Sequence, residues 1–243
     1  MRAAIVSDAH VAAADLRQWT LVKWIDGLDV DRLVILGDLF HAWWGWPGHV
    51  PALVAPVCNA LRRLRARGVA LTFVPGNHDF FPGQFFTDEL VADVTGEHER
   101  PLGGLTACLA HGDEADRSLG YRALRRVIRG PAAGRALGAL GPRWGQPVLN
   151  GLAGTGEVRS AARSSLVSAQ QRWSAHRLRR GADAVFLGHS HHAALVRLSD
   201  GLVVHTGAWA GLRTFVTVED RTVQLWRFGS AASEQEILDQ ESL

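Results

Sequence analysis

Short apolar runs recur along the chain, and a polar segment directly follows each of the first five. The runs are Arg2–Ser7, Arg32–Leu36, Ala70–Pro75, Leu105–Ala110 and Ala184–Leu187. Continuous apolar runs of this length predict strands that are buried on both faces. Because groups at the carboxyl ends of such strands gather at one edge of a sheet, we expect the polar segments to meet there.

Two longer segments, Asp15–Gly27 and Pro51–Arg67, are predicted to be helices, the second beginning with proline and ending before Gly68. Late in the chain, alternating apolar positions separated by turn residues predict antiparallel strands. These strands are Ala193–Leu198, Leu202–Thr206, Thr214–Glu219 and Thr222–Phe228. The polar tail from Gly229 onward is expected to be helical or frayed.

The polar segments after the first five strands contain side chains that bind metals. They read DAH, GD, GNHD, HG and GHSH, and they contribute Asp8, His10, Asp38, Asn77, His111, His189 and His191. Each segment alone is weak evidence, but all five in this order are typical of a site for two metal ions. A mixture of carboxylate, imidazole and amide ligands without thiolate favours Mn, Fe, Co or Zn.

Two adjacent cations suit the hydrolysis of phosphate esters and anhydrides, since they clamp the attacking and leaving oxygens together. Cations held that close need a bridging anion, and we expect the carboxylate of Asp38 to bridge them. The sequence therefore predicts a phosphoester or phosphoanhydride hydrolase.

The order of these motifs over about residues 1–210 resembles the calcineurin-like metallophosphoesterase family. The resemblance implies an α/β fold, a β-sandwich flanked by helices, with paired metals at its edge. It implies that Asp8, His10 and His191 join Asp38 on one metal, and that Asn77, His111 and His189 join it on the other. It also implies that His78 acts beside the substrate phosphate as electrostatic stabiliser or leaving-group acid, with Asp79 orienting it.

A closer resemblance is to the UDP-2,3-diacylglucosamine diphosphatases of lipid A synthesis, carried by Leu36–Trp44, Gly76–Phe80, His111–Asp113 with Asp116, Tyr121–Arg126 and Gly207–Trp209. Those enzymes depend on Mn2+ and split a pyrophosphate to give UMP and 2,3-diacylglucosamine 1-phosphate. The resemblance implies a discontinuous core over 1–113 and 181–230, a helical lid over 114–180 and a tail over 231–243.

Some residues depart from the pattern of those diphosphatases. This chain has His41 where they have Glu, His78 where they have Arg, and GHSHH where they have GHTHR. The metal ligands are unaffected, but the groups facing the substrate differ. A soluble metallophosphodiesterase or nucleotide pyrophosphatase with a non-lipid substrate therefore stays open as an alternative. A scaffold that does not catalyse a reaction is a third hypothesis.

The segment from Arg117 to Arg180 is rich in arginine, and Glu157 is its only acidic residue. Arginine binds phosphate in a bidentate manner, and the spacing around 122–129 predicts an amphipathic helix with one basic face. The basic face is expected to hold the nucleotide pyrophosphate or an anionic membrane surface, the alternative being an arginine face that only meets solvent. The predicted substrate-binding residues are Asp116, Tyr121, Arg122, Arg125, Arg126, Arg159 and Arg163.

Apolar residues between Ala132 and Leu152 either line an acyl-chain channel or pack the predicted lid onto the core. The aromatic residues at 43, 44, 46, 80, 81, 85 and 86 have two possible roles as well. They either form a lipid entrance or a surface for the uracil ring, or they pack in the core.

Composition limits the remaining possibilities. The 243 residues are 47% hydrophobic with a formal charge of +2, a balance that argues against a dedicated nucleic-acid binder. No apolar run approaches the roughly 18 residues of a membrane span, and no signal-peptide pattern precedes the first strand. Cys58 and Cys108 are expected to be buried free thiols. We therefore expect a cytoplasmic protein without an evident obligate protein partner, peripheral to the anionic inner membrane at most.

Overall fold

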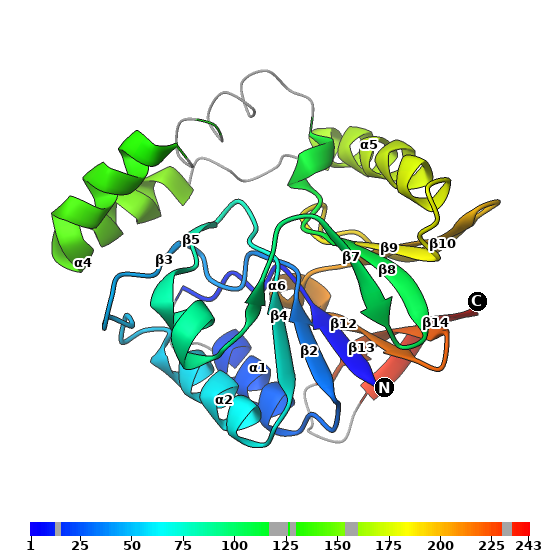
Figure 1. Cartoon of the computed structure of the whole chain (residues 1–243), viewed down its shortest axis with the longest axis horizontal. Coiled ribbons are helices and arrows are strands. Elements are labelled where there is room, and N and C mark those ends of the chain that lie inside the picture. The colour runs from blue at the N-terminus through cyan, green and yellow to red at the C-terminus, as the bar shows by residue number, and fades with distance from the viewer. Residues whose placement is uncertain (13–15, 117–125, 127–129, 154–159, 230–234) are drawn as a thin grey trace.

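The structure, a computed structural model, describes residues 1–12, 16–116, 126, 130–153, 160–229 and 235–243. Two β-sheets lie face to face, and helices cover the outer face of each (Figure 1). The layers therefore follow the order helix, sheet, sheet, helix, which confirms the predicted β-sandwich flanked by helices.

The larger sheet has seven strands in the order β14-β13-β12-β1-β2-β4-β6. Strands β1, β2, β4 and β6 run parallel, and β12 pairs antiparallel with β1. Its strands are β1 (Ala3–Val6), β2 (Arg32–Ile35), β4 (Ala70–Phe73), β6 (Asp93–Val94), β12 (Thr214–Glu219), β13 (Thr222–Phe228) and β14 (Gln235–Ser242). The parallel pairing brings the chain segments after β1, β2 and β4 to one edge of the sheet.

The smaller sheet has five strands in the order β10-β11-β9-β8-β7. Its centre, β8 with β9 and β9 with β11, is parallel. Its strands are β7 (His98–Leu102), β8 (Leu105–Ala110), β9 (Ala184–Leu187), β10 (Ala193–Leu198) and β11 (Gly201–Thr206). A separate two-stranded ribbon pairs β3 (Trp43–Trp44) with β5 (Asp79–Phe81).

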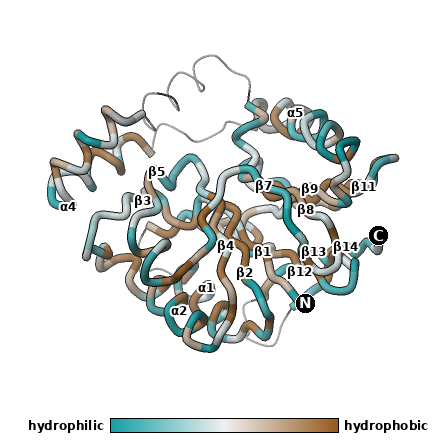
Figure 2. The backbone as a smooth tube through the Cα atoms, in the orientation of Figure 1, coloured by the Kyte–Doolittle hydropathy of each residue, from teal (hydrophilic) through white to brown (hydrophobic). Residues whose placement is uncertain are grey.

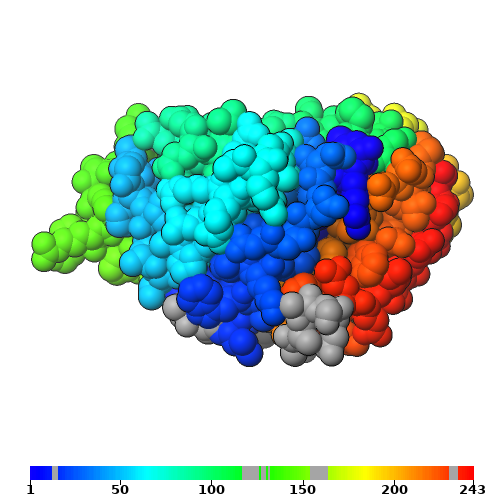
Figure 3. All heavy atoms as spheres, turned by 90° about the horizontal axis from the view of Figure 1, so that it is seen from below, coloured from blue at the N-terminus to red at the C-terminus, as the bar shows by residue number. Residues whose placement is uncertain are grey.

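Alternate residues of the inner strands point to opposite layers. In β1, Ala3 and Ile5 join the core between the sheets, whereas Ala4 and Val6 join the core beneath the helices. Burial on both faces explains why the strand is continuously apolar (Figure 2). Helices α1 (Leu16–Asp26) and α2 (Ala55–Ala66) cover the larger sheet on the face seen in Figure 3.

Helix α5 (Ser160–Leu178) covers the smaller sheet. Its Leu178 and the nearby Trp173 pack with Val185 and Val203 of the strands beneath. The division between core and lid at 114–180 stays a prediction, but α5, which lies in that interval, forms an outer layer of the sandwich.

Helix α4 (Pro131–Ala153) projects beside the β3–β5 ribbon and is broken by non-helical backbone at Gly141. Buried Leu137 and Leu149 pack on Trp44 and Trp46. Three short elements complete the described chain: η1 (Phe85–Glu89), η2 (Asp113–Ala115) and α6 (Trp209–Leu212). No helix in the described segments is long and apolar enough to cross a membrane.

The five early strands, the four late strands and both predicted helices are present, with ends shifted by a few residues. Helix α2 begins at Ala55, so Pro56, and not Pro51, occupies its first turn. The prediction for the tail was wrong, because residues 235–242 form β14 along the open edge of β13. An edge strand exposed on both faces can be polar throughout, so it lacks the apolar alternation that marks a strand in sequence.

Candidate metal centre

All seven predicted ligands follow directly after strands. Asp8 and His10 follow β1, Asp38 follows β2 and Asn77 follows β4. His111 follows β8, while His189 and His191 follow β9. The structure brings six of them together in neighbouring groups, one of Asp8, His10 and His191 and another of Asp38, His111 and His189. Within each group the potential ligand atoms lie within 4.8 Å of one another.

In the first group the side chains face a common point. The Nε2 atom of His191 lies 3.3 Å from Oδ1 of Asp8 and 3.3 Å from Nε2 of His10. Nε2 of His10 lies 3.9 Å from Oδ1 of Asp8. The three donors can therefore bind one cation together.

The carboxylate of Asp38 lies between the two groups. Its Oδ2 atom is 3.4 Å from Nε2 of His111 and 3.9 Å from Nε2 of His10. His111 Nε2 also lies 3.2 Å from the amide oxygen of Asn77. Asp38 thus occupies the position that a ligand shared between two ions needs.

The backbone is strained at these residues. Among the residues that the structure describes, nine residues other than glycine have positive φ, and five of them are Asp8, His10, Asp38, His189 and His191. Non-glycine residues rarely adopt this conformation, and such strain concentrates at functional sites. The remainder of the fold therefore holds these five ligands in place at a conformational cost.

Hydrogen bonds to the backbone orient the ligands. Nδ1 of His111 donates to the carbonyl oxygen of Leu36 at 2.7 Å, which leaves Nε2 to face Asp38. Oδ2 of Asp8 accepts from the backbone N–H of His189 at 3.0 Å. Oδ1 of Asp38 accepts from the backbone N–H of His78 at 2.8 Å.

The centre contains two buried carboxyl groups, those of Asp8 and Asp38. Burial alone would raise their pKa values, but the imidazoles of His191 and His111 hold the pKa of Asp8 and of Asp38 below the usual range. Burial lowers the pKa of His10 to about 4, so this imidazole is neutral at physiological pH and free to act as a ligand. Burial also lowers the pKa of His189.

Among the described residues, the side chains that pair with the two carboxylates are imidazoles. In the part of the chain that the structure describes, no Lys or Arg forms an ion pair with Asp8 or Asp38. Two buried carboxylates with imidazole and amide donors around them form a set that binds divalent cations well. The residues present therefore fit a pair of metal ions.

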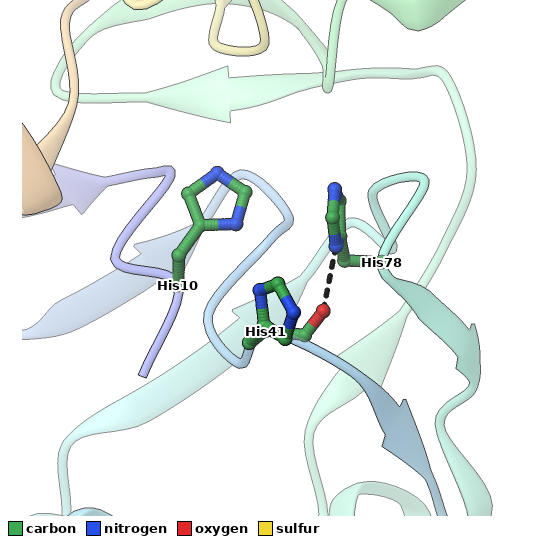
Figure 4. A group of neighbouring side chains, drawn as sticks. All are labelled: His10, His41 and His78. Atoms are coloured by element: carbon green, nitrogen blue, oxygen red, sulfur yellow. Dashed lines mark hydrogen bonds between the residues drawn. The ribbon is translucent and has the colours of Figure 1, made fainter. Parts of the chain in front are cut away.

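His78 lies beside this centre, with His10 and His41 next to it (Figure 4). Its Nε2 atom is 4.0 Å from Oδ2 of Asp38, and its ring centroid is 4.8 Å from that of His10. Its Nδ1 donates to the backbone carbonyl oxygen of His41 at 2.6 Å. His78 therefore presents Nε2 to the space next to the metal ligands.

The predicted role of Asp79 needs correction. Its Oδ2 atom accepts from the backbone N–H groups of Asp38 and Gly76, at 2.6 and 3.0 Å. The carbonyl of His41, and not this carboxylate, orients the ring of His78. Burial, with the charge of Asp38, raises the pKa of Asp79 to about 7. Asp79 therefore shapes the loop that carries Asp38.

Gln170 of α5 was missed by sequence reasoning. Its Nε2 atom donates to the carbonyl oxygens of Gly112 and Gly188, at 3.2 and 3.1 Å, and the residue is fully buried. Those glycines adjoin His111 and His189, so one side chain joins the two loops that carry them. A single glutamine on a mostly polar helix gives no signal in sequence.

The predicted substrate-binding residues are described only in part. Asp116 is half-buried directly after η2, and Arg126 is exposed. Arg163 lies on α5, but its side chain is outside the description, and Tyr121, Arg122, Arg125 and Arg159 lie outside the described residues. All seven stay predictions, as does the amphipathic helix around 122–129.

Some aromatic and apolar residues near the centre are buried in packing contacts, and others are exposed. Trp43 is buried against Phe40 and Phe86. Trp44 and Trp46 are buried beneath α4, with Nε1 of Trp46 donating to the carbonyl of Leu137 at 3.2 Å. Exposed apolar side chains remain at Phe81 and on α4 at Leu140, Trp144 and Val148. Trp144 and Val148, four residues apart after the break at Gly141, lie on one helical face, whereas Leu140 precedes that break.

The sequence model of the calcineurin-like phosphoesterase family matches residues 1–126, just over half of the chain. The chain belongs to this family. The family predicted from the motifs is thereby confirmed.

Several curated relatives are named UDP-2,3-diacylglucosamine hydrolase. The one from Serratia proteamaculans is 27% identical over 253 residues, covering 94% of this chain and 99% of that protein. One from Pseudomonas putida is 40% identical over 101 residues, covering 41% of this chain and 42% of that protein. The match to the Pseudomonas putida relative therefore spans less than half of its length.

Two solved structures share the fold over nearly the whole chain. Vacuolar Protein Sorting 29 from Cryptosporidium parvum has a TM-score of 0.54 at 10% identity, covering 100% of this chain and 98% of that one. The phosphoesterase Yfce from E. coli has a TM-score of 0.50 at 16% identity, covering 100% and 99%. At such identities the likeness concerns the fold alone.

Proposed function

We propose that this protein hydrolyses the pyrophosphate bond of UDP-2,3-diacylglucosamine to UMP and 2,3-diacylglucosamine 1-phosphate, a step of lipid A synthesis. The observation that carries the proposal is the likeness to the Serratia proteamaculans hydrolase, which extends over 94% of the chain. A match of that length has to include the interval between the two parts of the metal centre, where substrate-specific segments are expected.

The metal centre supports hydrolysis as the reaction. Two divalent cations, when bound, supply Lewis acidity at the phosphate and an activated water, and we propose that they are Mn2+. Asp38 would hold both, with Asp8, His10 and His191 on one side and Asn77, His111 and His189 on the other. The backbone strain and the hydrogen bonds described above keep these seven donors ready for the cations.

His78 is proposed to contact the substrate phosphate. The hydrogen bond from its Nδ1 to the carbonyl of His41 directs Nε2 toward the space beside Asp38. When both ring nitrogens carry a proton, Nε2–H can donate to a phosphoryl oxygen from that position and stabilise the charge that develops as the bond breaks. His78 is thus the proposed catalytic residue. Asp79 positions the loop of Asp38 and does not orient His78.

Features of helix α4 favour a lipid as the substrate. They also favour the proposal that the protein is cytoplasmic and binds the inner membrane peripherally. It exposes Leu140 before the break at Gly141 and Trp144 and Val148 after it, and the guanidinium of Arg143 lies 5.4 Å from the ring centroid of Trp144. Exposed tryptophan and aliphatic side chains beside arginine suit the interface of an anionic bilayer.

The proposal is tested by assaying the purified protein with added Mn2+. The substrates are UDP-2,3-diacylglucosamine, UDP-N-acetylglucosamine, CDP-diacylglycerol and an aryl phosphodiester. We expect the highest kcat/KM with the first, and UMP among its products. A preference for a substrate without acyl chains would refute the lipid proposal and leave phosphate hydrolysis intact.

A soluble metallophosphodiesterase or nucleotide pyrophosphatase is the second candidate function. It is favoured by His78, which stands where the diphosphatases have arginine, and by His41 beside it. This function predicts that water-soluble phosphodiesters turn over at least as fast as the lipid.

A further inference from the structure

A third group of imidazoles lies beside the two groups of metal ligands. Its members are His10, His41 and His78, whose potential ligand atoms lie within 4.8 Å of one another. His10 follows β1, His41 comes just before β3 and His78 directly precedes β5, and the three side chains lie next to one another (Figure 4). The imidazole of His41 is not one of the seven predicted ligands, so the pair of catalytic ions does not account for this group.

The β3–β5 ribbon holds two of the three rings together. The backbone N–H of Trp43 donates to the carbonyl oxygen of His78 at 2.9 Å, and Nδ1 of His78 donates to the carbonyl oxygen of His41 at 2.6 Å. Because Nδ1 carries the proton in the second bond, Nε2 of the neutral ring has a lone pair with which to bind a cation. The ring centroids of His41 and His78 are 5.6 Å apart. The backbone therefore keeps two imidazoles within reach of one ion.

His10 completes the group from the other side, with its ring centroid 4.8 Å from that of His78. Oδ2 of Asp38 lies 3.9 Å from Nε2 of His10 and 4.0 Å from Nε2 of His78. A carboxylate this close favours a cation beside the two rings. The side chain of His10 is 17% exposed and His41 is half-buried, so a cation can reach the group from solvent.

The donors of this group favour zinc. The group contains three imidazoles and no carboxylate, whereas each of the two groups of metal ligands contains an aspartate. Imidazole suits Zn2+, while Mn2+ is better served by carboxylate and other oxygen donors. A tetrahedral zinc ion needs nitrogens about 3.3 Å apart, so a small rotation of the side chains, from a spread of at most 4.8 Å, completes the set.

We propose that His10, His41 and His78 form an inhibitory zinc site. Zinc bound there takes the lone pair of Nε2 of His78, the group proposed to contact the phosphate, and competes with a catalytic ion for His10. Hydrolysis therefore falls while zinc is bound, and the imidazole of His41 makes the protein sensitive to zinc. The inhibition rests on the proposed function, whereas the binding of zinc can be measured without any substrate.

Titration of the Mn2+-loaded protein with Zn2+ tests the proposal by two readouts. Equilibrium dialysis gives the Kd for zinc, and initial rates with UDP-2,3-diacylglucosamine give the zinc concentration for half inhibition. His41→Ala removes one ligand of the group and leaves the seven catalytic ligands in place, and His41→Gln is a second variant that keeps a polar side chain. We expect each variant to raise both values by about 10-fold to 100-fold. His49→Ala, at a half-buried histidine beside Trp46, is the matched control and should behave as the wild type does.

Melting temperature and Mn2+ content show whether each variant is folded with its catalytic ions. Equal zinc affinity in the wild type and both folded His41 variants overturns the proposal, because zinc then binds at the catalytic ligands alone. Zinc that binds through His41 without slowing hydrolysis refutes the inhibitory role. If zinc affinity depends on His41 but UDP-2,3-diacylglucosamine is not hydrolysed, the zinc site stands and the lipid substrate is wrong. If the lipid is hydrolysed and zinc acts equally on all variants, only the zinc site is wrong.

Discussion

Nδ1 of His78 donates a hydrogen bond to the backbone carbonyl oxygen of His41, 2.6 Å away. The acceptor is main chain, so the orientation of His78 does not depend on which side chain occupies position 41. Replacement of His41 by Ala should therefore keep His78 in place, whereas replacement of His78 removes the donor beside Asp38.

Replacing His78 by Ala should lower kcat by about 100-fold or more, with KM changed little, because the lost contact forms mainly as charge develops on the phosphate. The His41→Ala variant should lose no more than about tenfold. Steady-state kinetics of the two variants with one substrate measure the difference. Equal losses would show that the imidazole of His41 is itself required.

Replacing Asp38 by Asn should abolish binding of at least one metal ion and lower kcat/KM by about 1000-fold or more. The amide keeps the size of the side chain but removes the charge that two cations share. Metal content after dialysis and activity with added Mn2+ provide the measurement. Asp26→Asn, at an exposed carboxylate paired with Arg63, is the control. Two equivalents of metal in the Asp38 variant would contradict the bridging role.

Replacing Gln170 by Leu should weaken metal binding by about 10-fold to 100-fold, although the residue is not a ligand. The change removes the donor to the carbonyls of Gly112 and Gly188, so the loops with His111 and His189 lose their common support. Metal titration followed by activity measures the loss. Gln171→Leu, one residue further along α5 and only half-buried, should titrate like the wild type.

His205 should make folding sensitive to acid. It is fully buried on β11, and burial lowers its pKa to about 4, with His192 adding to the shift. In the unfolded chain the pKa of this histidine is near 6.5. Between about pH 6.5 and about pH 4 the unfolded chain therefore binds more protons than the folded protein does, and the free energy of unfolding falls as the pH drops through this range. Lowering pH from 7.5 to 5 should cost the wild type about 2 kcal/mol more than His205→Leu in urea unfolding. An equal loss of unfolding free energy in the wild type and the variant would show that His205 is not the source of the acid sensitivity.

Replacing Trp144 by Ser should reduce sedimentation with vesicles of anionic phospholipid. Trp144 is 65% exposed on α4, beside Arg143, whereas Trp19 on α1 is 53% exposed and offers a matched control. Trp19→Ser should bind vesicles as the wild type does, and salt should weaken binding in both. If only Trp19→Ser lost binding, the contact surface would lie on the opposite face.

Much of the fold could be predicted because the strands of the sandwich are buried on both faces. Continuous apolar runs marked β1, β2, β4, β8 and β9, and each ended at a metal-ligand motif. The meeting of the seven ligands at one edge could be expected from their places after buried strands, whereas their division between two metals came from the resemblance to the family.

Other features depend on contacts between distant residues and left no local pattern. Strand β14 is mostly exposed at an edge and lacks apolar alternation, and the role of Gln170 depends on carbonyls 58 and 18 residues away. The carbonyl that orients His78 belongs to the backbone, so the side chain at position 41 could not reveal it.

The bonds from Gln170 to two loops of the metal centre tie α5 to the segments that carry His111 and His189. Moving α5 outward would strip the donor from the carbonyls of Gly112 and Gly188 and uncover the apolar residues around Leu178. Helix α4 is attached more loosely, through a few side chains such as Leu137 and Leu149. Among the described residues, outward movement of α4 would therefore break fewer of these contacts than outward movement of α5, which would also release the loops that carry His111 and His189.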